Sequence, residues 1–350
     1  MLILPADQAH FKALKQALRA ELPTLASSQA GEALAAGAGF RTYAALKAAL
    51  PSQIWEFQEE RLRERLHDFL PNEADSWTGW TSDTHRHPLW LGFHADQLHQ
   101  ISTLPTSGCL LIGGTAGQGK TSTLQSLMAY SRANNPKPLR AFHPSSTENF
   151  GAIMRAEPDQ VILGEIRNEQ GVRLLAHLVR SGAYVASTIL AGSLFALIER
   201  LRAFGLSERT LNQPHFFDCL IHQKLIPILC PHCARPYNAH AHPDLHARLN
   251  RVLPANALGS LRMRGDGCSQ CAQTNGWVGR TICAQVMRVP LGQTLSDQLS
   301  IREKKSTSLL SPHQANMGPT VLAHARWKMT RGMIDPHDLE LAIGPVDQDV

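Results

Sequence analysis

The first seventy residues carry apolar side chains at spacings of three and four, the pattern of a helix with one buried face. Phe11, Leu14, Leu18 and Leu22 form the clearest stripe. Pro23 follows directly and predicts the end of this helix. The chain is therefore expected to begin with a helical module.

Three more helical runs are expected before residue 71. The second follows Ser27 and Ser28, which are good N-cap residues, and glycines interrupt it. The third begins at Thr42 and stops at Pro51, and the fourth covers Ile54 to Leu70. Two short helices separated by glycines would also suit a helix-turn-helix reader of DNA. Because the segment TYAALKAAL has a single lysine, a small docking module is the favoured interpretation.

From residue 108 the pattern changes to short apolar runs that are typical of buried parallel strands. These runs are GCLLIGG at 108–114, VILGEI at 161–166 and AYVASTIL at 183–190. A helix-compatible stretch extends from Lys120 to about Asn134. Strands that alternate with helices predict an α/β sheet with nucleotide chemistry at the carboxyl ends of its strands.

Composition places the chain among soluble globular proteins. Of its 350 residues, 43% are hydrophobic and 18% are charged, and 34 basic residues face 29 acidic ones for a net charge of +5. No run of Lys or Arg forms a phosphate-tracking stripe, so the charge pattern does not favour nucleic acid. The sequence shows no signal peptide and no apolar span, so we expect a cytoplasmic protein that reaches a membrane only through partners.

A glycine-rich motif follows the first of the predicted strands. Residues 114–121 read GTAGQGKT, a full match to G-x-x-x-x-G-K-[ST]. The alternative is a glycine-rich turn with no ligand, but the strand before and the helix after favour a P-loop that binds ATP. Its lysine would reach the β- and γ-phosphates, and the hydroxyl of Thr121 would bind Mg²⁺. The predicted nucleotide-binding residues are Gly114, Thr115, Ala116, Gly117, Gln118, Gly119, Lys120, Thr121 and Ser122.

Four of the seven cysteines form two CxxC pairs. Cys230 and Cys233 lie in CPHC, and Cys268 and Cys271 lie in CSQC. Each such turn supplies two thiolates, so the four predict a closed, structural Zn²⁺ site rather than unrelated reduced thiols. His232 lies inside the first turn and is a weaker candidate ligand. The remaining cysteines, at positions 109, 219 and 283, are expected in the core.

The stretch MRAEPDQVILGEIRN, residues 154–168, places a carboxylate, Glu165, at the end of a predicted strand. Taken alone, such a Glu is typically an ordinary exposed residue. The stretch resembles, however, the secretion ATPases of type II secretion and type IV pilus assembly. Their pattern matches at Arg155, Pro158, Asp159, Gly164, Glu165 and Arg167, and similar segments continue from about residue 90 to about 290.

This resemblance implies roles for individual residues. Lys120 and Thr121 would hold the phosphates and Mg²⁺, and Glu165 would activate water. Arg155 and Arg167 would neutralise charge at the nucleotide, in the same subunit or across a subunit boundary. The family also works as a ring of six on an inner-membrane platform protein, so the resemblance implies a homo-hexamer at the cytoplasmic base of a membrane machine.

The sequence departs from the family at two motifs near the γ-phosphate. The family has an acidic Glu-Asp-Pro box where this chain has Phe142, His143 and Pro144. It also has histidines where this chain has Ala183 and Leu190. Glu148 is a candidate replacement carboxylate, and His143 a candidate nucleotide contact or a structural residue. These changes leave nucleotide binding intact, and slow turnover is as compatible with them as none.

Together these patterns predict a RecA-like P-loop core with a tetracysteine zinc lobe and helical ends. The predicted segments are a helical module at 1–70, a linker at 71–89, the ATPase core at 90–228, the zinc lobe at 229–285 and a helical segment at 286–350. The leading hypothesis is an ATP-hydrolysing motor for pilus assembly, protein secretion or conjugation. A non-hydrolysing nucleotide-binding scaffold of the same machine and a DNA-handling motor are the alternatives.

Overall fold

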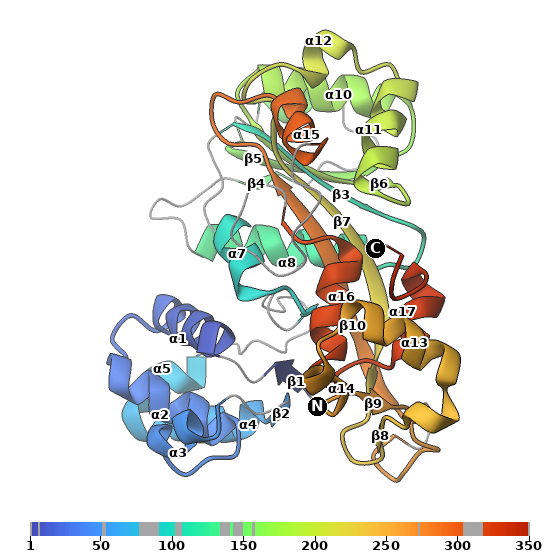
Figure 1. Cartoon of the computed structure of the whole chain (residues 1–350). Coiled ribbons are helices and arrows are strands. Elements are labelled where there is room, and N and C mark those ends of the chain that lie inside the picture. Colours follow the sequence, from blue (N-terminus) through green and yellow to red (C-terminus); the bar gives the residue numbers. More distant parts are fainter. Residues whose placement is uncertain are drawn as a thin grey trace. The chain divides into compact units, whose positions relative to one another are not determined.

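The computed structural model describes most of the chain, and Figure 1 shows its elements. The described residues are 2–5, 8–50, 54–76, 91–101, 107–133, 141–142, 150–155, 158–271, 274–303 and 318–348. They group into two compact units, each assembled from separate segments of chain. The sheet unit comprises 97–224 and 284–321, and the cysteine unit comprises 1–96, 225–283 and 322–350. The contiguous domain boundaries that we drew from the sequence stay a prediction.

A six-stranded sheet organises the sheet unit, and its strands follow the order β10-β7-β3-β6-β5-β4. The strands are β3 (Gly108–Gly114), β4 (Ala141–Phe142), β5 (Gln160–Ile166), β6 (Tyr184–Leu190), β7 (Phe217–Leu229) and β10 (Trp277–Arg288). The β3–β6, β3–β7, β4–β5 and β5–β6 pairs are parallel, which confirms the predicted α/β sheet. From residue 225 onward β7 belongs to the cysteine unit, as does β10 up to residue 283.

Helices cover both faces of this sheet. The helices in this part of the chain are α7 (Ala95–Ile101), α8 (Lys120–Ala133), α9 (Phe150–Arg155), α10 (Glu169–Arg180), α11 (Leu194–Ala203), α12 (Glu208–Leu211) and α15 (Leu295–Glu303). Cys109 and Leu111 of β3 share one core cluster with α10 and α11. Because side chains alternate along a strand, Leu110 and Ile112 lie on the opposite face, where α8 packs against β3 and β6.

The N-terminal part of the cysteine unit is helical, with one pair of short strands. Its helices are α1 (Gln8–Glu21), α2 (Ser27–Gly37), α3 (Tyr43–Ala48), α4 (Glu59–Phe69) and α5 (Pro71–Ser76). β1 (Leu2–Pro5) pairs antiparallel with β2 (Ile54–Phe57). The prediction of a helix over Ile54–Leu70 is therefore wrong for its first four residues. Their backbone groups bond to Leu2–Pro5, a partner about fifty residues away that local periodicity cannot reveal.

Two smaller corrections concern the same region. The N-cap of α2 is Ala26, so Ser27 and Ser28 are the first helical residues rather than the cap. The predicted linker begins with a helix, α5, which has a proline at its first position, where a missing N–H costs nothing. The glycine at the end of α2 has a packing reason, because a Cβ on Gly37 would lie 2.5 Å from the ring of Phe57.

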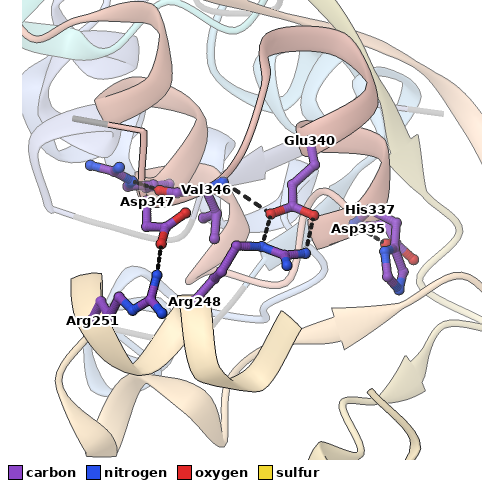
Figure 2. A network of polar contacts seen from close by, with 8 residues as sticks. Arg248, Arg251, Asp335, His337, Glu340, Val346 and Asp347 are labelled. Carbon is purple, nitrogen blue, oxygen red and sulfur yellow. Dashed lines mark hydrogen bonds and ion pairs between the residues drawn. The ribbon is translucent and has the colours of Figure 1, made fainter. Parts of the chain in front are cut away.

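The cysteine unit continues with short strands and helices. They are β8 (Arg235–Pro236), the 3-10 turn η1 (Ala239–Ala241), α13 (Pro243–Val252), α14 (Ala255–Leu258), β9 (Arg262–Met263), α16 (Val321–Met329) and α17 (Pro336–Ile343). Figure 2 shows how α13 is tied to the C-terminal segment. Arg248 donates from Nε and Nη2 to the two carboxylate oxygens of Glu340, both at 2.8 Å, and Arg251 pairs with Asp347 at 2.6 Å. In the described part of the chain, no helix is both long and apolar enough to cross a membrane.

Candidate nucleotide and metal sites

The glycine-rich motif forms the turn between β3 and α8, as predicted. Gly117 and Gly119 have φ angles of 73° and 72°, in the left-handed region that glycine adopts without strain. Among the described residues, nothing lies within 4 Å of the position that a Cβ would take on Gly117, so this part of the structure leaves the crest of the turn open. Of the predicted nucleotide-binding residues, Lys120 is buried, Gln118 and Gly119 are half-buried, and Thr115, Ala116, Gly117, Thr121 and Ser122 are exposed.

The first glycine of the motif is held by a neighbouring strand. A Cβ on Gly114 would lie 3.1 Å from the backbone oxygen of Gln223 on β7. The fully buried side chain of Gln223 also donates from Nε2 to the backbone oxygen of Gln118, at 2.5 Å. The sequence analysis missed this residue, since Gln223 belongs to no motif and lies about a hundred residues from the turn.

Glu165 lies level with the glycine-rich turn, across one intervening strand. Thr188 of β6 pairs with Ile112 of β3 on one side and with Glu165 of β5 on the other. The register of β5 shifts between Ile162 and Glu165. At this shift the hydroxyl of Ser187 donates to the backbone oxygen of Gly164 at 2.6 Å. The strand order thus brings the predicted acidic residue to the same edge of the sheet as the P-loop.

Two cations contact the Glu165 carboxylate. Lys120 Nζ lies 3.3 Å from Oε1, and Arg167 Nε lies 2.9 Å from Oε2. Lys120 also donates to the backbone oxygen of Thr115 at 3.1 Å. Burial acts to raise the pKa of Glu165, but the hydrogen bonds and charges of Arg167 and Lys120 outweigh burial and hold the pKa below its usual value. The carboxylate is therefore ionised at neutral pH and is able to accept a proton or bind a cation.

The other predicted site residues do not contact the Glu165 carboxylate in the described part of the structure, or lie outside the described residues. Arg155 is the exposed last residue of α9, and among the described residues no ion pair joins it to Glu165. Thr121 is exposed at the second position of α8. His143, Pro144 and Glu148 lie outside the described residues. The roles of Arg155 and Thr121 at a nucleotide remain predictions.

The four cysteines of the two CxxC turns converge in the cysteine unit. All four sulfur atoms lie within 4.8 Å of one another. The Sγ–Sγ distances are 3.7 Å for Cys230–Cys268, 3.5 Å for Cys233–Cys271 and 3.7 Å for Cys268–Cys271. Four thiolates at about 2.3 Å from a tetrahedral Zn²⁺ would be about 3.8 Å apart. The cluster of ligand groups contains these cysteines and not His232.

Two glycines permit the close packing of the turns around this cluster. A Cβ on Gly265 would lie 2.0 Å from the backbone oxygen of Cys233, and a Cβ on Gly276 would lie 2.6 Å from the backbone oxygen of Gly265. Gly276 also has a φ of 95°. Its backbone oxygen accepts from the N–H of Cys230 at 2.8 Å. The donor set and the distances fit a four-coordinate metal ion.

Two buried polar residues of β7, Asp218 and His222, belong to neither of these two candidate sites. Asp218 on β7 accepts from the Tyr184 hydroxyl at 2.7 Å and pairs with Arg288 at 3.0 Å. Burial raises the pKa of Asp218 to about 6, against the opposing effects of Arg288 and Tyr184. His222, also on β7, is buried, and burial together with the charge of Lys224 lowers its pKa to about 4. Cys109, Cys219 and Cys283 are buried, as expected.

Comparison with known proteins identifies the family of the chain. Residues 146–340, more than half of the chain, match the family model described as Type II/IV secretion system protein. The chain belongs to this family of secretion and pilus traffic ATPases, which confirms the resemblance seen in its motifs.

Individual relatives are distant. The chain is 27% identical over 247 residues to Type II secretion system protein E of Pseudomonas aeruginosa, covering 65% of this chain and 46% of that protein. It is 24% identical over 220 residues to the type IV pilus assembly ATPase PilB of the same organism, covering 57% and 38%. The chain thus spans less than half the length of these relatives. The X-ray structure of the Legionella pneumophila ATPase DotB superposes with a TM-score of 0.47 at 13% identity, covering 74% of this chain and 66% of that one.

Proposed function

We propose that this chain binds ATP at residues 114–122 and hydrolyses it slowly, as the RecA-like motor subunit of a pilus or secretion machine. The observation that carries the proposal is the convergence of Lys120 and Glu165 at one edge of a parallel sheet, 3.3 Å apart. A lysine that can contact phosphate and a carboxylate that can orient water, separated by one strand, are two of the groups that P-loop enzymes use in phosphoryl transfer.

Each residue of the proposed site would have a separate role in the reaction. The backbone N–H groups of the turn and the amino end of α8 would receive the phosphates, and Lys120 would leave the carboxylate to contact them. Glu165 would then be free to accept a proton from the attacking water. Arg167 would hold Glu165 from its exposed side. Mg²⁺, when bound, neutralises charge on the β- and γ-phosphates, and the hydroxyl of Thr121 is the group that would hold it.

The tetracysteine cluster supports a structural role for Zn²⁺ in the same protein. Four sulfur ligands fill a tetrahedral coordination sphere, so no position is left for a reacting water. Cys230, Cys233, Cys268 and Cys271 would join two distant turns and hold a lobe that is otherwise built from short elements. Zinc is proposed here for stability and not for catalysis.

Assembly and partners follow from the family. Ring formation by six copies, and docking of the ring on an inner-membrane platform protein, are proposed from the relatives' membership of secretion and pilus systems. A non-hydrolysing scaffold is the second candidate. It is favoured by the sequence changes at both family motifs near the γ-phosphate. Phe142 and His143 stand where the family has its acidic pair, and Ala183, just before β6, and Leu190, its last residue, stand where the family has histidines.

The experiment that tests the proposal is ATP binding and hydrolysis by the full chain beside Lys120→Ala. The matched control is Lys12→Ala, which removes an exposed lysine of α1. We expect nucleotide binding and turnover in the wild type and the control, and loss of both in Lys120→Ala. Binding that survives in Lys120→Ala would overturn the proposal. Binding without turnover in the wild type would favour the scaffold.

A further inference from the structure

The side chain of Gln223 enters the glycine-rich turn from the adjacent strand. β7 runs parallel to β3 with His222 opposite Gly113, so the next residue on β7 lies beside the first glycine of the motif. The Gln223 side chain is fully buried, and its Nε2 donates to the backbone oxygen of Gln118 at 2.5 Å. Gln118 stands between the two glycines whose φ angles are positive. Its carbonyl is therefore a fixed point in the most sharply bent part of the turn.

The orientation of the Gln223 amide follows from its partner. A backbone oxygen can only accept, so the NH₂ group must face Gln118 and the amide oxygen must face the other way. In the described part of the chain this buried Oε1 has no hydrogen-bond partner. An unmatched buried acceptor is a cost to folding, which an apolar residue of similar size would avoid. Stability alone therefore does not account for an amide at this position.

The planarity of the peptide bond links this contact to the phosphate-binding face of the turn. In a trans peptide the C=O of one residue and the N–H of the next point in opposite directions. When Gln223 holds the carbonyl of Gln118 toward β7, the N–H of Gly119 is turned away from β7, toward the hollow of the turn. In P-loops the N–H groups that point into this hollow bind phosphate oxygens.

We infer that Gln223 is a positioning residue, which aims the Gly119 N–H at a nucleotide phosphate by holding the carbonyl of Gln118. The inference rests on the proposed function, since it assigns a role within the proposed nucleotide site. If Gln223 positions this N–H group, then phosphate affinity depends on a residue of β7 as well as on the residues of the glycine-rich motif. Gln223 touches the turn and not the ligand.

The test compares Gln223→Leu with His222→Leu in the full chain. Both changes replace a buried polar residue of β7 by leucine, but His222 is the adjacent residue, so its side chain faces the opposite side of the sheet. We expect Gln223→Leu to weaken ADP and ATP binding by about tenfold each, the effect of one misaligned hydrogen bond to a charged group. The affinities for ADP and ATP should fall equally, because the P-loop backbone binds the phosphates that the two nucleotides share. His222→Leu should leave both affinities unchanged.

A second variant keeps the size of the side chain. Gln223→Met removes the donor and keeps the length of the side chain, so it should weaken ADP binding as much as Gln223→Leu, and it carries the test where the leucine variant does not fold. In steady-state hydrolysis the KM should rise more than kcat falls. Gln223 variants that bind ADP as tightly as the wild type, with only a lower melting temperature, would overturn the inference. A wild type that binds no nucleotide would overturn the proposed function as well.

Discussion

The glycine-rich turn and the tetracysteine cluster are both built from tight turns, yet different parts of the chain hold them. The turn lies between a buried strand and a helix, and Gln223 and the Lys120–Glu165 ion pair fasten it from within the protein. The cluster brings together two turns that are 34 residues apart in sequence, and sulfur atoms are the groups that meet. The first site should thus persist without a ligand, whereas the second should need its metal. Damage to the turn should reduce function, and damage to the cluster should reduce stability.

The largest expected effect is on the cluster. Cys268→Ser removes one of the four sulfur ligands, and a structural Zn²⁺ contributes directly to folding. We expect the variant to lose stoichiometric zinc and to melt roughly 10 °C lower, the equivalent of several kcal/mol for a protein of this size. Elemental analysis and thermal unfolding measure the two effects. Cys283→Ala, which removes a buried thiol outside the cluster, should keep its zinc. A Cys268→Ser protein with full zinc would show that the cluster is not the metal site.

The turn should behave in the opposite way. Glu165→Gln keeps the shape of the side chain but removes the base, so we expect ATP turnover to fall by about a hundredfold to a thousandfold. ATP affinity should not fall, because Lys120 loses an internal anion that competes with phosphate. The melting temperature should change far less than in Cys268→Ser, because the strand and helix that carry the turn remain. Glu169→Gln, at an exposed position of α10, is the control. Equal turnover in the two variants would exclude Glu165 as the base.

Two buried groups on β7 give the sheet unit a pH dependence with opposing signs. The pKa of His222 is about 4 in the folded chain, below its ordinary value, so the unfolded state takes up a proton first as the pH falls. Acidification from pH 7 to pH 5 should cost about 2 kcal/mol of stability through this group. The pKa of Asp218 is raised to about 6, so its contribution is present at low pH and is lost as the pH rises through 6.

Urea unfolding at pH 7 and pH 5 separates these two contributions. His222→Asn should lose less stability than the wild type between the two values, and Asp218→Asn should lose more. The same loss in all three proteins would mean that neither side chain titrates as its burial implies.

The smallest effect is expected from the ion pairs of the cysteine unit. A double-mutant cycle on Arg248 and Glu340, which form two 2.8 Å hydrogen bonds and are partly buried, should give a coupling of about 1 kcal/mol. The same cycle on Arg65 and Asp68, a single contact between more exposed side chains, should give a value near zero. A coupling near zero for both pairs would mean that the Arg248–Glu340 ion pair does not help to hold α13 to the C-terminal segment.

The sequence correctly predicted the strands, turns and helices that depend only on residues close together in the chain. The apolar run at 108–114, the glycines of the turn and the helix from Lys120 all formed where their patterns placed them. The convergence of the two CxxC turns could be predicted because pairs of cysteines at this spacing typically bind a metal ion when the thiols are reduced. Glu165 was predicted as a site residue from the family pattern, because the residues around it in the sequence do not distinguish it from an ordinary exposed glutamate.

Features that depend on distant pairing could not be found in this way. IWEF at 54–57 extends an apparent helical run, and its strand conformation depends on residues 2–5. Gln223 lies in a strand with no motif, and only the sheet register places it against the turn. The Tyr184–Asp218–Arg288 group likewise joins three strands that are far apart in the chain. A β-branched and aromatic composition at 54–57 was the one available signal, and it favoured a strand.

The ion pair between Lys120 and Glu165 has a consequence for how phosphate enters the site. Lys120 shares the Glu165 carboxylate with Arg167, so in the proposed site binding of a nucleotide replaces one anion by another at the lysine instead of satisfying a bare charge. Such an exchange draws less on long-range attraction than an unpaired lysine would, so the rate of nucleotide association should depend less on ionic strength in the wild type than in Glu165→Gln. The same exchange frees the carboxylate only when a phosphate has arrived. In the proposed mechanism, arrival of the substrate and release of Glu165 are then a single event, and a chain without nucleotide keeps this carboxylate paired with Lys120.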